Sequence, residues 1–114
     1  MSIQLHNVTL DCADPQRVAA FWSEALARPI DDGASDGFVS IGINDGEETG
    51  WFFIQVPEGK TVKNRAHFDL QADDRDAEVT RLLGLGATKV GEYDEDGERW
   101  TTLRDVEGNE FCVA

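Results

Sequence analysis

Two stretches of the chain decide its fold: Asn7-Val8-Thr9-Leu10-Asp11-Cys12-Ala13-Asp14 and, sixty residues later, His67-Phe68-Asp69-Leu70-Gln71-Ala72-Asp73-Asp74. Each stretch alternates polar and apolar residues, carries leucine at its fourth position, ends in aspartate and precedes a helical pattern. A repeat of this length indicates two copies of one supersecondary unit, neither of which buries its apolar face alone. Two sheets built from such units predict a cleft between them, and clefts are where small molecules bind.

Composition restricts the classes of function. The 114 residues are 40% hydrophobic, which is typical of one soluble globular domain. The net charge of −13 argues against nucleic acid and anionic membranes as partners, because both require clustered positive charge. The sequence shows neither a signal-peptide pattern nor a run of about 20 apolar residues that could span a membrane. Cys12 and Cys112 lie in apolar, strand-like segments, so we expect free thiols in a reducing cytoplasm.

The first half of the sequence predicts a strand, a helix and three further strands. Residues 5–13 alternate as a strand, and Asp14-Pro15 supplies a helix N-cap and first helical residue. Apolar residues then recur at helical spacing as far as Leu26, and Pro29 ends the helix. The further strands are expected at residues 29–32 (the weakest), 38–43 and 51–56.

The second half repeats this order. Residues 66–72 read as a strand, Asp74 caps a helix that Gly86 ends, and three strands are expected at residues 88–93, 98–104 and 110–114. The predicted fold class is α+β, with two βαβββ modules, residues 1–57 and 64–114, that form curled mixed sheets around a cleft and carry their helices outside. A domain this small with a cleft at its centre gains from pairing with a second copy, so we expect a homodimer.

Several motifs resemble the glyoxalase-like branch of the vicinal oxygen chelate superfamily, which includes glyoxalases, bleomycin resistance proteins and extradiol dioxygenases. They are the two modules, the aromatic pair Phe21-Trp22, the closing run from Asp105 to Cys112 and, most specifically, the pattern Lys-x-x-Lys-Asn-Arg-x-His-x-Asp that ends at Asp69. The resemblance covers essentially the whole chain. Two turns depart from the family pattern, with Val106 where proline is usual and Ala27 where glycine is usual.

The resemblance implies two curled sheets around a cleft, often in a dimer. In metal-using members of the superfamily a divalent ion sits in the cleft, held by His, Glu or Gln. The reactions implied are isomerisation, epimerisation, ring-opening dioxygenation and thiol addition, and some members only bind and sequester a drug. Because one fold hosts many chemistries, the site residues must decide the function.

The metal-ligand positions that the resemblance implies correspond here to Asn7, Ile54, His67 and Cys112. Isoleucine cannot bind a metal, and asparagine is a poor ligand for transition metals. The two suitable residues, His67 and Cys112, are expected at opposite ends of the cleft, whereas a catalytic metal needs about three protein ligands. We therefore expect no tightly bound metal and no other cofactor, with a metal-dependent lyase, isomerase or dioxygenase as the alternative.

We predict instead that the cleft binds a small organic molecule. The residues expected to line it are Asn7, Phe52, Ile54, Arg65, His67, Asp69, Trp100 and Cys112. His67 is the candidate catalytic residue, as a general base, or else a strand histidine bonded to Asp69, Asn7 or backbone. Cys112 faces the cleft by strand parity, either as small apolar filler or as a nucleophile with His67 as its base. Trp100 belongs either to the cleft or to the core.

Three of the ten basic residues, Lys60, Lys63 and Arg65, fall within six positions of this acidic chain. If the strand at residues 66–72 extends to Arg65, that side chain leaves the same face as His67. Its guanidinium suits a carboxylate or phosphate, which predicts an acidic ligand with Lys63 or Lys60 at the rim. The alternative is that these residues form ion pairs with carboxylates such as Asp69.

Overall fold

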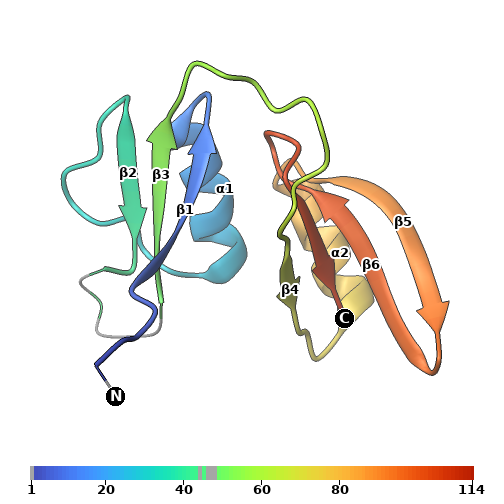
Figure 1. Ribbon diagram of the computed structural model, residues 1–114. Helices are drawn as coiled ribbons and strands as arrows, with labels where there is room; N and C mark the ends of the chain where they lie inside the picture. The colour runs from blue at the N-terminus through green and yellow to red at the C-terminus, as the bar shows by residue number, and fades with distance from the viewer. Residues whose placement is uncertain (1, 44, 46–48) are drawn as a thin grey trace. The chain divides into compact units, whose positions relative to one another are not determined.

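A computed structural model describes residues 2–43, 45 and 49–114. Within these residues, seven strands form two open mixed sheets and the chain has two helices, an α+β fold (Figure 1). The chain divides into two compact units, Met1–Gly59 and Lys60–Ala114, here called module one and module two. Neither helix of the described chain has the length and apolar character that crossing a membrane requires.

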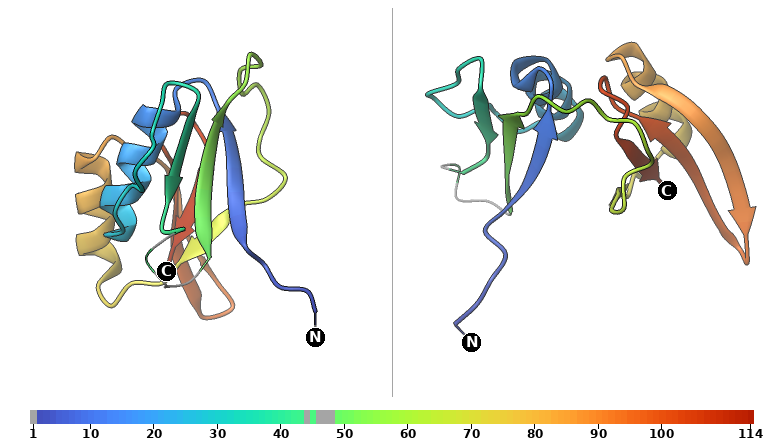
Figure 2. Two further views of the ribbon diagram at one scale, coloured as in Figure 1. Left: turned by 90° about the vertical axis from the view of Figure 1, so that its left-hand side faces the viewer. Right: turned by 45° about the horizontal axis from the view of Figure 1, so that its top comes forward.

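Module one contains β1 (Asn7–Cys12), α1 (Pro15–Leu26), β2 (Phe38–Ile41) and β3 (Gly50–Gln55). Its sheet has the order β1-β3-β2, with β1 parallel and β2 antiparallel to β3. Both views in Figure 2 show α1 along one face of this sheet, as its contacts with all three strands require. The parallel β1–β3 pair needs a crossover connection, and α1 lies within it.

Local signals place α1 where the sequence predicts it. The Asp14 carboxylate accepts a hydrogen bond from the Arg17 amide at 3.3 Å, and Pro15 occupies the first turn. The apolar stripe of the helix buries Trp22, which stacks on Trp51 of β3 at a ring-centroid distance of 5.1 Å. The core of module one therefore lies between α1 and the sheet.

The prediction of a strand at residues 29–32 is wrong, because the structure has only an isolated bridge between Ile30 and Ile41. Pro29 has no amide hydrogen to donate to a ladder. The Asp31 carboxylate instead accepts hydrogen bonds from the Ser40 hydroxyl at 2.8 Å and the Ile43 amide at 3.0 Å. Together with the backbone hydrogen bond from the Asp31 amide to the Ser40 carbonyl at 2.9 Å, these side-chain bonds hold the segment against β2 without a regular ladder.

Module two has all five predicted elements: β4 (Phe68–Leu70), α2 (Arg75–Gly84), β5 (Thr88–Glu95), β6 (Glu98–Arg104) and β7 (Glu110–Val113). The sheet order is β4-β7-β6-β5, with β4 parallel to β7 and the other pairs antiparallel. β4 is shorter than the predicted strand at residues 66–72. One face of the sheet carries fully buried side chains and α2 packs against β7, which leaves the other face for a site.

Candidate functional site

Module two holds a cavity of about 470 Å³ on the sheet face that carries the even-numbered residues of β6 and β7. The odd-numbered Leu103, Phe111 and Val113 point to the opposite, buried face. Alternation along the strands thus separates a core face from a binding face. The cavity is lined by Lys63, His67, Asp69, Leu70, Tyr93, Trp100, Thr102, Glu110, Cys112 and Ala114.

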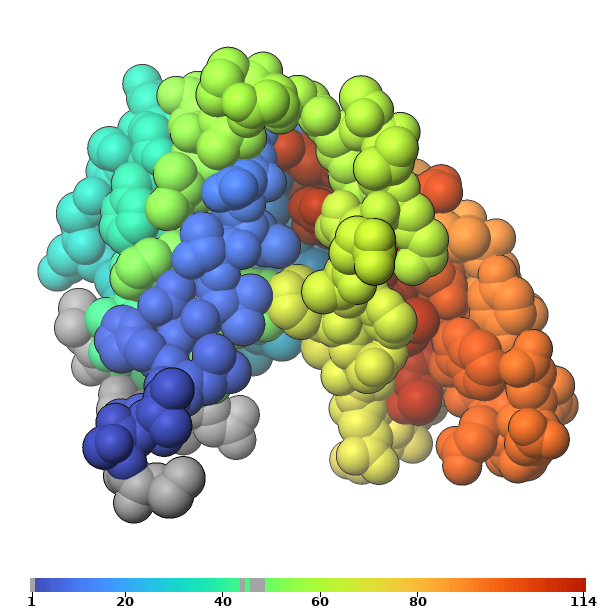
Figure 3. All heavy atoms as spheres, viewed as in Figure 1, coloured from blue at the N-terminus to red at the C-terminus, as the bar shows by residue number. Residues whose placement is uncertain are grey.

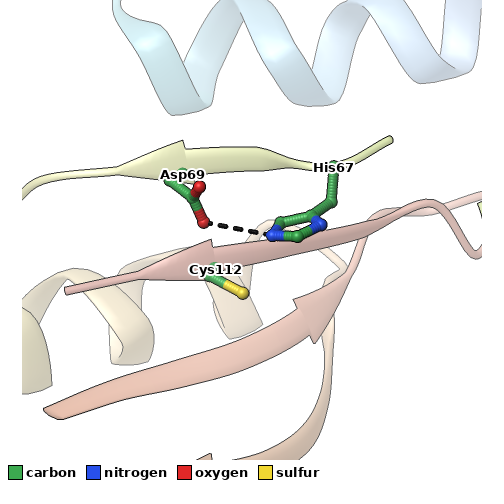
Figure 4. Close-up of side chains that lie close together, drawn as sticks. All are labelled: His67, Asp69 and Cys112. Carbon is green, nitrogen blue, oxygen red and sulfur yellow. Dashed lines mark ion pairs between the residues drawn. The ribbon is translucent and has the colours of Figure 1, made fainter. Parts of the chain in front are cut away.

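Three chemically active side chains meet in this cavity (Figure 4). The donor atoms of His67, Asp69 and Cys112 all lie within 4.8 Å of one another. Asp69 and Cys112 are register partners on the parallel strands β4 and β7, so their side chains leave the sheet on the same face. His67 comes two residues before Asp69, and its Nε2 lies 3.4 Å from the Asp69 Oδ1. Of the partners predicted for His67, Asp69 is therefore within ion-pair distance.

The thiol of Cys112 also contacts a hydroxyl group. Thr102 is the register partner of Cys112 on β6, and its Oγ1 lies 3.3 Å from the Cys112 Sγ. Cys112 is half-buried. Cys112 therefore lines the cavity, as its strand parity predicts. One hydroxyl, one imidazole and one carboxylate lie near its thiol.

An aromatic wall bounds the cavity. Tyr93 of β5 and Trp100 of β6 are register partners whose rings stack at 5.4 Å with an interplanar angle of 21°. The structure thereby places Trp100 in the cavity rather than in the core. Tyr93 is missing from the sequence prediction, yet a signal was present. Asp96-Gly97 has positive φ at both residues, as a two-residue hairpin turn of type I′ requires, and that turn fixes the pairing of Tyr93 with Trp100.

Basic residues lie at the cavity or beside Glu110, one of its lining residues, but they differ in role. The segment from Lys60 to His67, yellow-green in Figure 3, lies on the face shown. Lys60 Nζ is 3.1 Å from Glu110 Oε2, and Arg104 Nε is 3.6 Å from the same oxygen. Lys63 lines the cavity itself. Arg65 lies in a bend, and β4 begins only at Phe68. The strand therefore does not extend to Arg65, as it would have to for that side chain to leave the same face as His67.

Glu110 is a buried carboxylate that stays ionised. Burial acts to raise the pKa of this side chain, but hydrogen bonds from the Asn64 amide, Lys60 and its own backbone amide outweigh that effect. The charge of Lys60 acts in the same direction, and the pKa falls to about 2. Glu110 therefore fixes Lys60 and the loop before β4 rather than exchanging protons at neutral pH.

Module one carries three of the predicted site residues, Asn7 on β1 and Phe52 and Ile54 on β3. The Asn7 side chain bonds the Thr9 hydroxyl at 3.0 Å and the His6 ring at 2.8 Å. Phe52 packs edge-on against Phe38 at 5.1 Å, and Ile54 is the register partner of Phe38. The joint site across both modules stays a prediction.

The ligand positions predicted for the last strands of the two modules, Ile54 and Cys112, are not equivalent, and the strand register differs from that assignment by two residues. Thr9 corresponds to Asp69 in the repeat, and Thr9 pairs with Phe52 whereas Asp69 pairs with Cys112. Phe52 is therefore the counterpart of Cys112 in module one. The correction leaves the metal argument for module one unchanged, because phenylalanine has no ligand atom.

Among the described residues, the three that together could hold a metal lie in module two. The prediction that His67 and Cys112 stand at opposite ends of a cleft is wrong, since both belong to one three-residue cluster with Asp69. Imidazole nitrogen, carboxylate oxygen and thiolate sulfur together suit Zn²⁺ or a similar transition metal, and three protein ligands leave a position open. The three ligands His67, Asp69 and Cys112 therefore fit a divalent ion better than the two suitable ligands that the sequence predicts.

Comparison with known proteins agrees with this architecture. A family model described as a glyoxalase-like domain matches residues 7–114. No curated protein matches the chain.

Among solved structures, the hypothetical protein SA1046 from S. aureus is 20% identical, with a TM-score of 0.75, and the match covers 99% of this chain and 94% of that one. A glyoxalase/bleomycin resistance protein/dioxygenase family enzyme from Burkholderia phytofirmans PsJN is 17% identical, with a TM-score of 0.78 and 97% coverage of both chains. A mutant of the fosfomycin resistance protein FosX from Listeria monocytogenes is 15% identical, with a TM-score of 0.79, covering 99% of this chain and 90% of that one. At these identities the structural matches establish the fold.

Proposed function

Because the chain belongs to the glyoxalase-like domain family, we propose that it binds a small, flat organic acid in the cavity of module two. The observation that carries the proposal is the stacked pair Tyr93–Trp100 in the same cavity as Lys63. A cavity of about 470 Å³ has the size of a small-molecule site. Stacked aromatic rings favour a flat ligand, and an ammonium group favours an anion.

The distribution of charge supports the acidic group. A net charge of −13 repels anions at long range, so an anion binds only where the local charge is reversed. Lys60 and Arg104 are engaged by Glu110, whereas Lys63 lines the cavity. Lys63 thus replaces Arg65 as the residue proposed to attract the acid. The FosX structure from Listeria contains Mn(II) and a dihydroxypropylphosphonic acid, which shows that this fold accommodates a small organic acid.

A pair of matched ligands tests the proposal. Isothermal titration calorimetry is run with 3-benzoylpropionic acid and with its neutral amide, on the wild type, Lys63→Gln and the matched control Arg65→Gln. We expect the acid to bind more tightly than the amide, and Lys63→Gln to reduce that preference about tenfold, equivalent to about 1.4 kcal/mol. Arg65→Gln should retain the preference. Equal affinity for acid and amide in the wild type, or a loss caused by Arg65→Gln alone, would overturn the assignment.

The cluster of His67, Asp69 and Cys112 favours a second candidate function, a metal-dependent lyase, isomerase or dioxygenase. A bound divalent ion would supply Lewis-acid polarisation of a substrate oxygen. The first proposal needs no metal, so elemental analysis followed by titration with manganese, iron, nickel and zinc ions separates the two. Stoichiometric, tight binding that His67→Ala and Asp69→Asn both abolish would favour the enzyme.

We also propose that the protein is a cytoplasmic homodimer. Both cysteines are free thiols, in keeping with a reducing compartment. Phe38 and Ile54 remain 36% exposed on neighbouring strands of module one, apolar surface that a second copy could cover. Multi-angle light scattering should give twice the chain mass at micromolar concentration, and a monomer would contradict the dimer.

A further inference from the structure

The two cysteines of the chain occupy opposite kinds of environment. Cys12 is 3% exposed in module one, where its thiol contacts the Ile54 carbonyl at 3.6 Å. Cys112 lines the open cavity of module two. Buried thiols are inert, whereas an accessible thiol beside a base can react. The structure therefore contains an internal control for the reactivity of Cys112.

The neighbours of Cys112 match the needs of a nucleophile. An activated nucleophile has a base nearby, and the base is oriented by a third group. The ligand atoms of His67 and Cys112 lie within 4.8 Å of one another, and the His67 Nε2 lies 3.4 Å from Oδ1 of Asp69, a side chain that is 76% exposed (Figure 4). A neutral imidazole whose Nε2 donates to that carboxylate keeps Nδ1 as its proton acceptor. The Thr102 hydroxyl, 3.3 Å from Sγ, adds a hydrogen-bonding partner for the sulfur.

We propose that Cys112 adds covalently to a planar α,β-unsaturated carbonyl compound that carries an acidic group. The inference rests on the proposed function, because it uses the same cavity and the same acid. The Cys112 Sγ forms a bond to the β-carbon while its proton passes to His67. The π bond of the alkene breaks, its electron pair moves to the α-carbon and carbonyl as an enolate, and His67 returns the proton to the α-carbon. No group leaves, and no oxidant, reductant or second substrate is required.

The cavity favours this class of electrophile. Conjugated carbonyl compounds are flat, and the Tyr93–Trp100 stack provides a flat apolar wall. A thiolate is a strong nucleophile, so it can add to such an alkene without a metal ion. Lys63 on the same cavity would hold the acid end of the molecule.

The test uses 3-benzoylacrylic acid, the unsaturated analogue of 3-benzoylpropionic acid, in the presence of EDTA. Intact-mass spectrometry and peptide mapping follow the adduct with time over a range of probe concentrations, so that the rate constant at saturation is separated from the affinity. We expect labelling of Cys112 but not Cys12, faster than the labelling of glutathione at the same pH. His67→Gln should lower the saturated rate at least about tenfold, because general base catalysis contributes factors of this size or more. His6→Gln, the only other histidine, is the matched control and should react as the wild type does.

Two results would overturn the proposal: a Cys112 rate no greater than that of glutathione, or an unchanged saturated rate in His67→Gln. Circular dichroism confirms that each variant is folded, and Asp69→Asn offers a second route to the same question by releasing the imidazole. The saturated acid reports binding independently. If it binds but the unsaturated acid forms no adduct, the nucleophile is wrong and the proposed function stands. If the His67-dependent adduct forms but the saturated acid does not bind, the proposed function is wrong and the nucleophile stands.

Discussion

The Nζ atom of Lys60 lies 3.1 Å from Oε2 of Glu110, and this ion pair joins the loop before β4 to the first residue of β7. The Glu110 side chain is only 7% exposed, and its Oε1 accepts a hydrogen bond from the Asn64 amide at 3.0 Å. A buried carboxylate paired in this way anchors the segment that carries Lys63 and His67 into the cavity. Loss of its charge should therefore weaken module two.

Glu110→Gln is expected to lower the free energy of unfolding at neutral pH by about 2 kcal/mol, less than the full pKa shift corresponds to because Lys60 is partly exposed and screened. The pKa of Glu110 falls from 4.5 to about 2 on folding, so its contribution is present above pH 4.5 and is lost as the pH falls toward 2. Urea unfolding of both proteins between pH 7 and pH 2.5 measures the difference.

The control for this experiment is Glu98→Gln, an exposed glutamate on β6. Its unfolding free energy should stay within about 0.5 kcal/mol of the wild type across the same range. A Glu110→Gln difference that does not shrink on acidification would show that the carboxylate charge is not what stabilises the loop.

The turn between β6 and β7 depends on Asp105. Its buried carboxylate accepts hydrogen bonds from the Glu107 amide at 2.9 Å, the Asn109 amide at 3.0 Å and the Asn109 Nδ2. Asp105→Ala should destabilise the protein by about 2–3 kcal/mol, because it leaves these buried donors without an acceptor. The exposed Asp73→Ala serves as control, and equal denaturation midpoints for the two variants would contradict the role of Asp105.

A third prediction concerns Ala27, which ends α1 in the left-handed conformation with φ of 53°. Ala27→Gly should raise the unfolding free energy by about 1 kcal/mol, because glycine adopts this conformation without the steric cost that a Cβ imposes. Ala27 is exposed, so no packing is lost.

The matched control is Ala20→Gly, in the middle of the same helix and also exposed. Glycine there should cost about 1 kcal/mol, so the two substitutions are expected to have opposite signs in one thermal unfolding series. A destabilised Ala27→Gly would mean that the backbone at residue 27 is not held in the left-handed region in solution.

Local chemistry explains which parts of the fold the sequence predicts. The start of each helix follows from an N-cap aspartate whose carboxylate accepts a hydrogen bond from the amide three residues later. Asp14 accepts from Arg17 in this way, and Asp74 accepts from Ala77. Residue 27 is alanine where the family pattern has glycine, yet the helix still ends there, because Ala27 adopts the left-handed conformation that glycine usually supplies. The segment at residues 29–32 forms a single bridge and no strand: Pro29 has no amide to donate, and the Asp31 carboxylate bonds Ser40 and Ile43, which an apolar pattern does not reveal.

Non-local pairing limits the prediction of the site. Strand parity places Cys112 on the cavity face, but the equivalence of Phe52 with Cys112 depends on the register between the first and last strands of each module. The meeting of His67, Asp69 and Cys112 depends on the same parallel pairing of β4 with β7. A role for Arg65 beside His67 requires a longer β4, and the three residues of that strand do not reach it.

The last prediction concerns the aromatic wall. Trp100→Leu should weaken the binding of 3-benzoylpropionic acid about fivefold to tenfold, since it removes one ring of the stacked pair, and aromatic contacts contribute about 1 kcal/mol beyond the burial of area. Tyr93→Phe is the matched control: it removes the hydroxyl but keeps the ring that stacks on Trp100 at 5.4 Å, so affinity should change less than about twofold. Calorimetry with an aliphatic acid of similar length measures the part of the effect that is specific to the aromatic ring. If Trp100→Leu weakens the aromatic and aliphatic acids equally, the Tyr93–Trp100 pair does not select flat ligands.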